Sequence, residues 1–331
     1  MRTTLRDIAK ASNVSVTTVS LVLNGKANEI SEATQKRVLA AARKLEYTPN
    51  LAARGLQKAS SNLLLLLVPD LENTFYTSIA RHAVSHALTL GYLLILASLP
   101  QDQKEEERLL KMVKGGLFEG MLILSRKFAA IRDEASKDEN IPYVMLDEDI
   151  EDETKPSLIT GDNESGGYLV GDYLCELGHR RIAFLTGPND TPNSMRRLSG
   201  AVKAINDRGY EVNPRFIFEG DYSAQSGYQM MAQIMKNKPS ALFCFNDFMA
   251  YGFLRACKEN GVQVPHDISV VGYDALVLRS FLIPELTTVD QHAEEIGKIG
   301  VEKLIGLIQT HEKETILIQP SLIIGETTDK Y

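Results

Sequence analysis

The sequence contains no apolar segment long enough to cross a membrane. Its longest apolar run is Leu63 to Val68, whereas a membrane-spanning helix needs about 20 apolar residues. The amino terminus lacks the apolar stretch of a secretory signal, and no low-complexity tract or Gly/Ser-rich linker interrupts the chain. We therefore expect a cytoplasmic globular protein that folds along its whole length.

Cysteine is scarce and does not suggest a disulfide framework. The sequence has three, Cys175, Cys244 and Cys257, at spacings that do not pair. We expect them to be small, reduced, buried side chains, as in cytoplasmic proteins. Cys175 and His179 could share one helix face as metal ligands, but two ligands do not make a site, so we expect no metal.

The net charge of −7 argues against a nucleic-acid partner only if it is evenly spread, and it is not. Residues 1–60 contain ten Lys and Arg against four Asp and Glu, whereas the remainder contains 26 against 39. A basic head on an acidic body suits a head that meets phosphate. A solvated basic face is the alternative.

At 331 residues the chain exceeds a single ordinary core, so two or three domains are expected.

Three short helical patterns in the basic head predict a helix-turn-helix. Thr4 and Asp7 have the spacing of a capping box in front of the first helix. Ser15 and Ser31 stand at the N-cap positions of a second and a third helix, and Pro49 ends the third. The residues expected to face the small core are Leu5, Ile8, Ala9, Val19, Val22, Leu23, Val38, Leu39, Ala42 and Leu45.

At three places the head resembles the LacI/GalR family of bacterial repressors. Residues 4–9 read TLRDIA, residues 14–20 read VSVTTVS, and residues 47–56 read YTPNLAARGL. The likeness continues to the carboxyl terminus. It implies a sequence-specific DNA-binding regulator that is not an enzyme, with a helix-turn-helix domain at 1–48 and a hinge helix and linker at 49–60.

In that family the start of the second helix reads base edges in the major groove. The resemblance places Val16, Thr17 and Leu21 at the reading positions. Several relatives carry a basic or imidazole side chain where this chain has Leu21, so we expect a different operator; a core position for Leu21 is the alternative. The hydroxyl and amide groups suited to phosphate contacts are Ser15, Thr18, Asn24, Ser31, Thr34 and Asn50.

The segment after Pro49 resembles the hinge helix of the family. A helix of about nine residues is unstable alone, and Gly55 weakens it further. The resemblance implies that this helix orders when two subunits meet on the minor groove, where Leu56 inserts between base pairs. An inert linker is the alternative.

Strand and helix patterns alternate from Leu63 onward. They predict strands at 63–68, 92–97, 120–124, 181–185, 241–245 and 269–273, and helices at 74–90, 103–114, 164–177, 194–207, 224–235 and 248–260. Such alternation predicts parallel sheets with helices on both faces, and two series predict two lobes. The expected fold is an all-α helix-turn-helix head on an α/β body of two doubly wound lobes.

The resemblance adds that the lobes are of the periplasmic-binding-protein type. It implies three crossings between them, near Gly161, near Asp290 to Gln291 and near Pro320. Residues 61–331 would then form one effector-binding and dimerisation domain. Its amino-terminal lobe would comprise about 61–160 and 291–319, and its carboxyl-terminal lobe about 161–290 and 320–331.

Ligands of doubly wound sheets lie beyond the carboxyl ends of the strands. Asn246 and Asp274 follow predicted strands, and Arg197 belongs to an RLSG motif whose arginine reaches the cleft in relatives. Such groups suit the hydroxyls of a sugar, although helix capping is an alternative for Asn246 and Asp247. The residues expected at the effector are Asn73, Phe75, Tyr76, Arg197, Tyr222, Asn246, Asp274 and Gln291.

These features favour a homodimeric repressor of carbohydrate-utilisation genes that a small sugar-like effector releases from a pseudo-palindromic operator. A regulator whose ligand or phosphocarrier partner tightens DNA binding is the alternative, and the sequence does not decide whether a phosphocarrier protein binds. No leucine heptads follow the last strand, which favours a dimer over a tetramer.

Two other classes fit the sequence less well. A plain sugar receptor would have a signal peptide and no basic head. An α/β enzyme would need a phosphate-binding Gly loop or a nucleophile and base, and residues 161–167 lack the GxGxxG order. We expect no cofactor apart from the effector.

Overall fold

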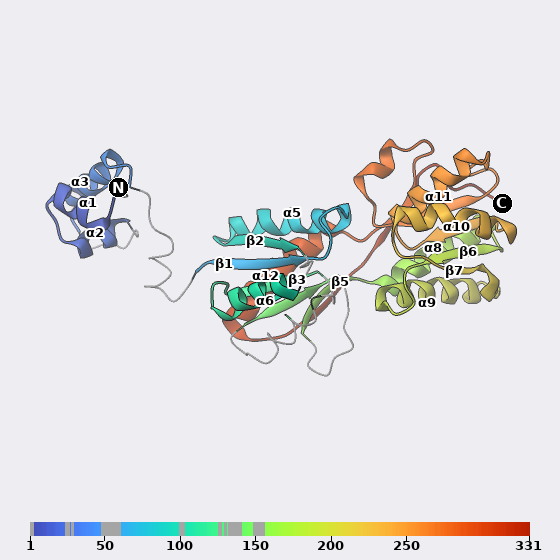
Figure 1. Ribbon diagram of the computed structural model, residues 1–331, viewed down its shortest axis with the longest axis horizontal. Helices are drawn as coiled ribbons and strands as arrows, with labels where there is room; N and C mark the ends of the chain where they lie inside the picture. The colour runs from blue at the N-terminus through green and yellow to red at the C-terminus, as the bar shows by residue number, and fades with distance from the viewer. Residues whose placement is uncertain are drawn as a thin grey trace. The chain divides into compact units, whose positions relative to one another are not determined.

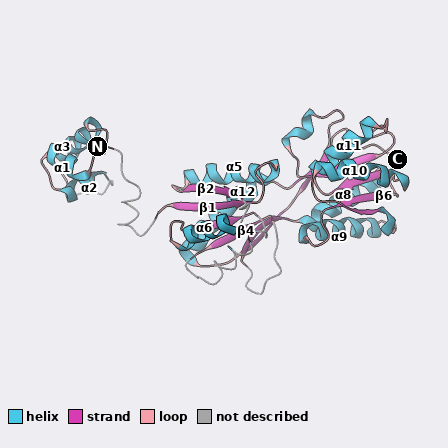
Figure 2. Cartoon of the chain, in the orientation of Figure 1, coloured by secondary structure: helices cyan, strands magenta, loops and turns pink. Residues whose placement is uncertain are grey.

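The computed structural model of the chain describes residues 3–23, 27, 30–47, 61–98, 103–124, 128, 131, 141–147 and 156–331. It divides into two compact units, Met1–Ser61 and Asn62–Tyr331. Figures 1 and 2 show that the first unit is helical and that the second contains two lobes of strands and helices. Among the described residues no helix is both long and apolar enough to span a bilayer.

Three helices form the head, α1 (Leu5–Ser12), α2 (Val16–Leu23) and α3 (Glu32–Lys44). The predicted capping box is present, because the Thr4 amide donates to Asp7 Oδ2 at 2.8 Å and the Asp7 amide donates to Thr4 Oγ1 at 3.4 Å. Ile8, Val19 and Val38, one from each helix, are completely buried. The core of the head therefore forms where the apolar faces of three short amphipathic helices pack together.

Two details of the head differ from the sequence prediction. Leu39, expected in the core, is 40% exposed, because it lies about 100° around the helix from Val38. Ser31 occupies the N-cap position of α3 but makes no side-chain bond to the helix backbone. Its hydroxyl lies 3.0 Å from Thr34 Oγ1 instead.

The amino-terminal lobe has a six-stranded sheet in the order β11-β5-β4-β3-β1-β2, with all neighbours parallel. Its strands are β1 (Leu63–Val68), β2 (Leu93–Ser98), β3 (Gly120–Ile123), β4 (Tyr143–Leu146), β5 (Ser157–Gly161) and β11 (Thr315–Ile318). Its helices are α5 (Thr74–Thr89), α6 (Gln103–Lys114) and α12 (Ala293–Thr310).

The leucine run of β1 is buried on both sides of this sheet. Leu64 and Leu66 pack in a cluster with α5 and α12. Leu65 and Leu67 pack in a second cluster that includes Val113 of α6. Alternate side chains of a strand point to opposite faces, so a continuous apolar run fits a strand between two helical layers.

The carboxyl-terminal lobe has a second six-stranded sheet in the order β12-β10-β9-β8-β6-β7, parallel except that β12 runs antiparallel to β10. Its strands are β6 (Ile182–Thr186), β7 (Ile217–Glu219), β8 (Ala241–Cys244), β9 (Ser269–Tyr273), β10 (Thr287–Asp290) and β12 (Ser321–Ile323). Its helices are α8 (Asn163–Glu176), α9 (Pro192–Asp207), α10 (Ala224–Lys236) and α11 (Asp247–Glu259), with 3-10 turns η2 (Pro214–Phe216) and η3 (Val277–Phe281).

The chain passes between the two sheets three times, as Figure 1 shows. β5 belongs to the first sheet and leads into α8 of the other lobe. β10 belongs to the second sheet and leads into α12, which packs on α5. The third passage joins β11 to β12. The predicted fold class, a helix-turn-helix head with an α/β body of two parallel-sheet lobes, is confirmed.

Candidate functional site

The eight residues that the sequence assigns to the effector all line one small pocket between the two lobes of the body. They are Asn73, Phe75, Tyr76, Arg197, Tyr222, Asn246, Asp274 and Gln291. The pocket has a volume of about 50 Å³, which is the space of one or two waters. This volume is smaller than that of a sugar ring.

Arg197, near the start of α9, is buried in this pocket. Its Nε donates to Asn163 Oδ1 at 2.7 Å, one terminal nitrogen donates to the Phe245 carbonyl, and the other donates to Gln291 Oε1 at 3.3 Å. The guanidinium carbon lies 3.8 Å from the centre of the Tyr273 ring. Hydrogen bonds and a cation–π contact thus fix the charge in one orientation.

Two glycines allow this placement by bringing α8 and α9 into backbone contact. A Cβ on Gly167 would lie 2.0 Å from the Arg197 carbonyl oxygen, and a Cβ on Gly200 would lie 1.9 Å from the Glu164 carbonyl oxygen. A larger residue at either position would push the helices apart. The distance from Arg197 to Asn163 depends on this close packing.

Gln291 connects Arg197 to Asp274. Gln291 Nε2 donates to Asp274 Oδ1 at 2.7 Å, while Gln291 Oε1 accepts from Arg197. Asp274 follows β9 with a φ of 119°, a conformation that a non-glycine residue rarely adopts. Burial raises the pKa of the Asp274 carboxyl well above its usual range; Arg197 opposes this shift, and Asp247 and Asp147 add to it.

Two asparagines both cap helices and line the pocket. Asn73 accepts from the Phe75 amide at 2.9 Å at the start of α5. Asn246 accepts from the Met249 amide at 2.9 Å at the start of α11 and donates to the Tyr222 carbonyl at 2.8 Å. The capping role and the pocket position of Asn246 are therefore compatible.

Three residues of the lining, Asp147, Thr191 and Asn193, were not predicted from the sequence. Asp147 is buried and directly follows β4, a short strand that was not predicted. Asn193 Nδ2 donates to the Asp147 carbonyl at 2.9 Å, which joins the two lobes. The signal that could have found Asp147 is the same one that found Asp274, a polar residue directly after an apolar run.

The pocket combines carboxyl, amide, guanidinium and phenol groups with aromatic rings. The rings of Phe75 and Tyr76 lie 5.9 Å apart, centre to centre, on the side of the amino-terminal lobe. A few polar groups beside aromatic rings are typical of small-molecule sites, where the polar groups fix the orientation of the ligand.

Cys175 and His179 do not share a helix face, because α8 ends at Glu176 and His179 lies beyond it. Both ring nitrogens of His179 are engaged, Nδ1 with Ser240 Oγ and Nε2 with the Asp329 carbonyl, each at 3.0 Å. Cys175, Cys244 and Cys257 are buried free thiols. In the described part of the chain no three His, Cys, Asp or Glu side chains are grouped to hold a metal ion.

A larger pocket of about 460 Å³ shares Phe75 and Asp274 with the small one. Its other walls are α5, the start of α12 and residues 275–277. The segment that follows β9 therefore borders both pockets.

In the head, the expected base-reading residues share the outer surface of α2. Val16 and Leu21 are 41% and 39% exposed, and Thr17 is exposed, whereas Val19 is buried. Leu21 is thus at the surface and not in the core.

Four of the expected phosphate-contacting residues, Ser15, Thr18, Ser31 and Thr34, lie at helix starts. Ser15 Oγ accepts from the Thr18 amide at 3.0 Å, which caps α2. Ser15 and Thr18 hydroxyls lie 2.8 Å apart, and Ser31 and Thr34 form the equivalent pair at α3. Asn24, Asn50 and Leu56, with the expected hinge helix, lie outside the described residues.

Comparison with known proteins matches both units of the chain. Residues 4–50 match the bacterial regulatory proteins of the lacI family, and residues 172–328 match the periplasmic binding protein-like domain. The HTH-type transcriptional repressor PurR of Aliivibrio salmonicida is 33% identical over 333 residues, 99% of each chain. The HTH-type transcriptional regulator DegA of Bacillus subtilis is 30% identical, over 99% of this chain and 98% of DegA.

Comparison with solved structures gives the same result as comparison of the sequences. The Lac repressor dimer bound to operator and the anti-inducer ONPF superimposes with a TM-score of 0.86 at 32% identity, covering 99% of this chain and 100% of that one. The complex of the transcriptional regulator CelR with cellobiose gives a TM-score of 0.74 at 28% identity, covering 98% and 100%. Because the likeness spans the head and both lobes, the chain belongs to the LacI family of bacterial regulatory proteins and is a DNA-binding transcriptional regulator.

Proposed function

We propose that this regulator represses carbohydrate-utilisation genes and that a small uncharged sugar, bound between the lobes, releases it from its operator. The observation that carries the proposal is the buried network from Arg197 through Gln291 to Asp274. Sugar hydroxyls both donate and accept hydrogen bonds, and this network offers both functions within one pocket. CelR, a structural neighbour, is described with cellobiose.

The charges around the pocket favour an uncharged ligand over a sugar phosphate. Asp147 and Asp274 are both buried in the lining. Three nitrogens of Arg197, the pocket's guanidinium, already donate to protein oxygens. A phosphate would meet two carboxyl groups and only the remaining donors of one arginine, and burial makes such an uncompensated charge costly.

The release mechanism follows from the small volume of the pocket, about 50 Å³. We propose that a bound sugar changes the separation of the lobes, which is a two-state change. We propose that the change acts on the segment 49–60 as a hinge helix that orders only on DNA. That segment lies outside the described residues.

We propose that the exposed surface of α2 reads the operator. Val16, Thr17 and Leu21 would contact bases, and only Thr17 offers a hydrogen bond there. The apolar pair would contact thymine methyl groups. The groups proposed to fix the head on the phosphates are Ser15, Thr18, Asn24, Ser31, Thr34 and Asn50.

We propose that the protein acts in the cytoplasm as a homodimer on a two-fold operator. One supporting feature is the edge strand β2, whose Leu93 and Leu96 are exposed. Another is the segment after β9, where Phe281 and Ile283 are 76% and 94% exposed. Exposed apolar groups of this kind are typical of surfaces that a partner covers, and the Lac repressor neighbour is described as a dimer.

Two measurements test the proposal. Operator sequences are first selected from random DNA with the full chain at physiological salt, and a thermal-shift panel then compares uncharged sugars with their phosphates. We expect one palindromic family of sequences and stabilisation by an uncharged sugar that weakens the gel-shift complex. If the stabilising sugar tightens that complex, the regulator uses a corepressor. If no sequence is enriched, the proposed operator is wrong.

A further inference from the structure

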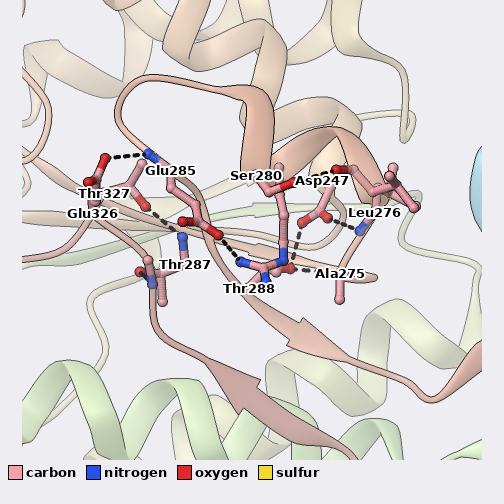
Figure 3. Close-up of polar contacts among 12 residues, drawn as sticks. Asp247, Ala275, Leu276, Ser280, Glu285, Thr287, Thr288, Glu326 and Thr327 are labelled. Carbon is pink, nitrogen blue, oxygen red and sulfur yellow. Dashed lines mark hydrogen bonds and ion pairs between the residues drawn. The ribbon is translucent and has the colours of Figure 1, made fainter.

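Asp247 is a completely buried carboxyl that borders neither pocket. It is the first residue of α11. Asp247 Oδ1 accepts from Thr288 Oγ1 at 2.6 Å, and Oδ2 accepts from the Leu276 amide at 2.7 Å. Figure 3 shows the side chain directed at both partners. Its two oxygens therefore connect α11 to β10 and to the segment after β9.

That segment, residues 274–276, is called here the strap. Asp274 and Ala275 have φ values of 119° and 52°, in the region that residues with side chains rarely occupy. The Ala275 amide donates to Thr288 Oγ1 at 3.4 Å, so the same hydroxyl accepts from the strap and donates to Asp247. The unusual backbone of the strap is held by this arrangement.

The two ends of the strap belong to different parts of the body. Asp274 lines the small pocket and accepts from Gln291. Leu276 is buried and packs in the cluster of the amino-terminal lobe that contains Phe75 and Ile296. Asp274 and Leu276 are only two residues apart, so a displacement of Asp274 can be transmitted through the backbone to the Leu276 side chain in the other lobe.

We propose that Asp247 is a positioning residue for the effector response: as a carboxylate it holds the strap rigid, so that movement of Asp274 reaches the amino-terminal lobe through Leu276. The effector part of this inference rests on the proposed function. The clamp itself does not, because its contacts are all made within the protein.

The ionisation of Asp247 gives the clamp a recognisable pH dependence. Burial raises the pKa of Asp247 to about 7, against the hydrogen bonds from Thr288, Leu276 and Tyr273 and the charge of Arg279. The other titratable groups that interact with it are Asp274, Tyr251 and Cys244. A protonated carboxyl accepts more weakly than a carboxylate, so the clamp is held above this pKa and loosens below it.

Hydrogen exchange of the full chain, followed by mass spectrometry between about pH 6 and 8 and corrected for intrinsic exchange, tests the clamp without a sugar. Thr288→Val removes the shared hydroxyl, and Thr288→Ser keeps it as the matched control. We expect residues 274–281 to exchange about tenfold faster in the valine variant, the factor for losing a hydrogen bond to a charged group. The serine variant should match the wild type.

Asp247→Asn supplies the pH readout. The asparagine keeps an acceptor for the Leu276 amide but does not titrate, so the strap should exchange independently of pH, whereas wild-type exchange should accelerate as pH falls. A pH profile in D247N equal to that of the wild type overturns the clamp. Acceleration that is equally large in β6, the buried strand of the same lobe, also overturns it, because the role is then general stability.

Leu276→Ala tests the connection to the other lobe, with Val277→Ala, which truncates an exposed neighbour, as control. L276A should accelerate exchange in the first half of α5, and V277A should not. Equal exchange in both variants refutes the connection. The sugar panel plays no part in these outcomes, so a failure here is distinct from a failure of the proposed function.

Discussion

Replacing Asp274 with asparagine is expected to stabilise the fold while abolishing the response to sugar. Asparagine keeps an oxygen for the hydrogen bond from Gln291 Nε2, which is 2.7 Å long. It removes a negative charge that burial, together with Asp247 and Asp147, disfavours. It also places a donor where ligand hydroxyls are proposed to donate, so affinity falls although the shape is kept.

The sign of the effect on stability follows from proton linkage. The pKa of Asp274 is raised in the folded state, so stability from this group is fully present below the unfolded-state pKa and is lost as pH rises toward the folded one. The attraction of Arg197 is already included in that raised value. We therefore expect D274N to be more stable than the wild type near pH 7.5 and to gain less near pH 5; the scale is the roughly 1 to 4 kcal/mol gained when buried charged groups are replaced by neutral ones.

Urea unfolding followed by circular dichroism at both pH values measures this gain. The matched control is Asp290→Asn, at the end of the neighbouring strand, where a partly exposed carboxyl accepts from the His292 amide at 2.7 Å. The control should stay within about 0.5 kcal/mol of the wild type. A D274N protein that is less stable than the wild type at both pH values, or that keeps the full thermal shift with sugar, refutes the reasoning.

Three further substitutions test the site and the head. Arg197→Lys replaces the forked guanidinium with a single ammonium group, so it should leave two of the three buried oxygens without a hydrogen bond. Urea titrations should show a free energy of unfolding lower by about 2 to 6 kcal/mol. The control, Arg196→Lys at the neighbouring position, should change the free energy of unfolding little. Gly167→Ala brings a methyl group against the Arg197 carbonyl and should cost about 1 to 3 kcal/mol and weaken the thermal shift with sugar. Thr17→Ala should weaken binding to the selected operator by about 1 to 3 kcal/mol in gel shifts and leave binding to random DNA unchanged.

Sequence patterns reveal β1, β2, β3, β6, β8 and β9, but they miss the short apolar strand β4 and the polar strand β10. The run of β1 is recognisable because all six residues are apolar, and five of them are buried. β10 reads TTVD, yet Thr287 and Thr288 are completely buried. Their hydroxyls bond to Thr328 and Asp247, partners that are distant in sequence. A local window cannot show that a polar strand is buried when its hydrogen bonds come from elsewhere in the fold.

The same limit separates the site residues that were predicted from those that were not. Asp274 follows a strand that its apolar residues reveal, whereas Asp147 follows β4, which was not recognised, and so it was missed. Helix capping is one interpretation of Asp247 from the sequence, because this residue stands at the start of a helix. Its actual partners, Leu276 and Thr288, are 29 and 41 residues away.

The three aspartates near the small pocket explain why the body is suited to respond to a ligand. Asp147, Asp247 and Asp274 are all buried. The charges of Asp147 and Asp247 disfavour ionisation of Asp274, and the charge of Arg197 favours it. Buried charges that are incompletely balanced reduce stability. A ligand whose hydroxyls donate to the two carboxyls of the pocket, Asp147 and Asp274, would therefore offset part of this cost, and its binding energy would become available to hold the lobes in their other arrangement. Replacing Asp147 or Asp274 with a neutral residue would give a more stable body and a weaker switch.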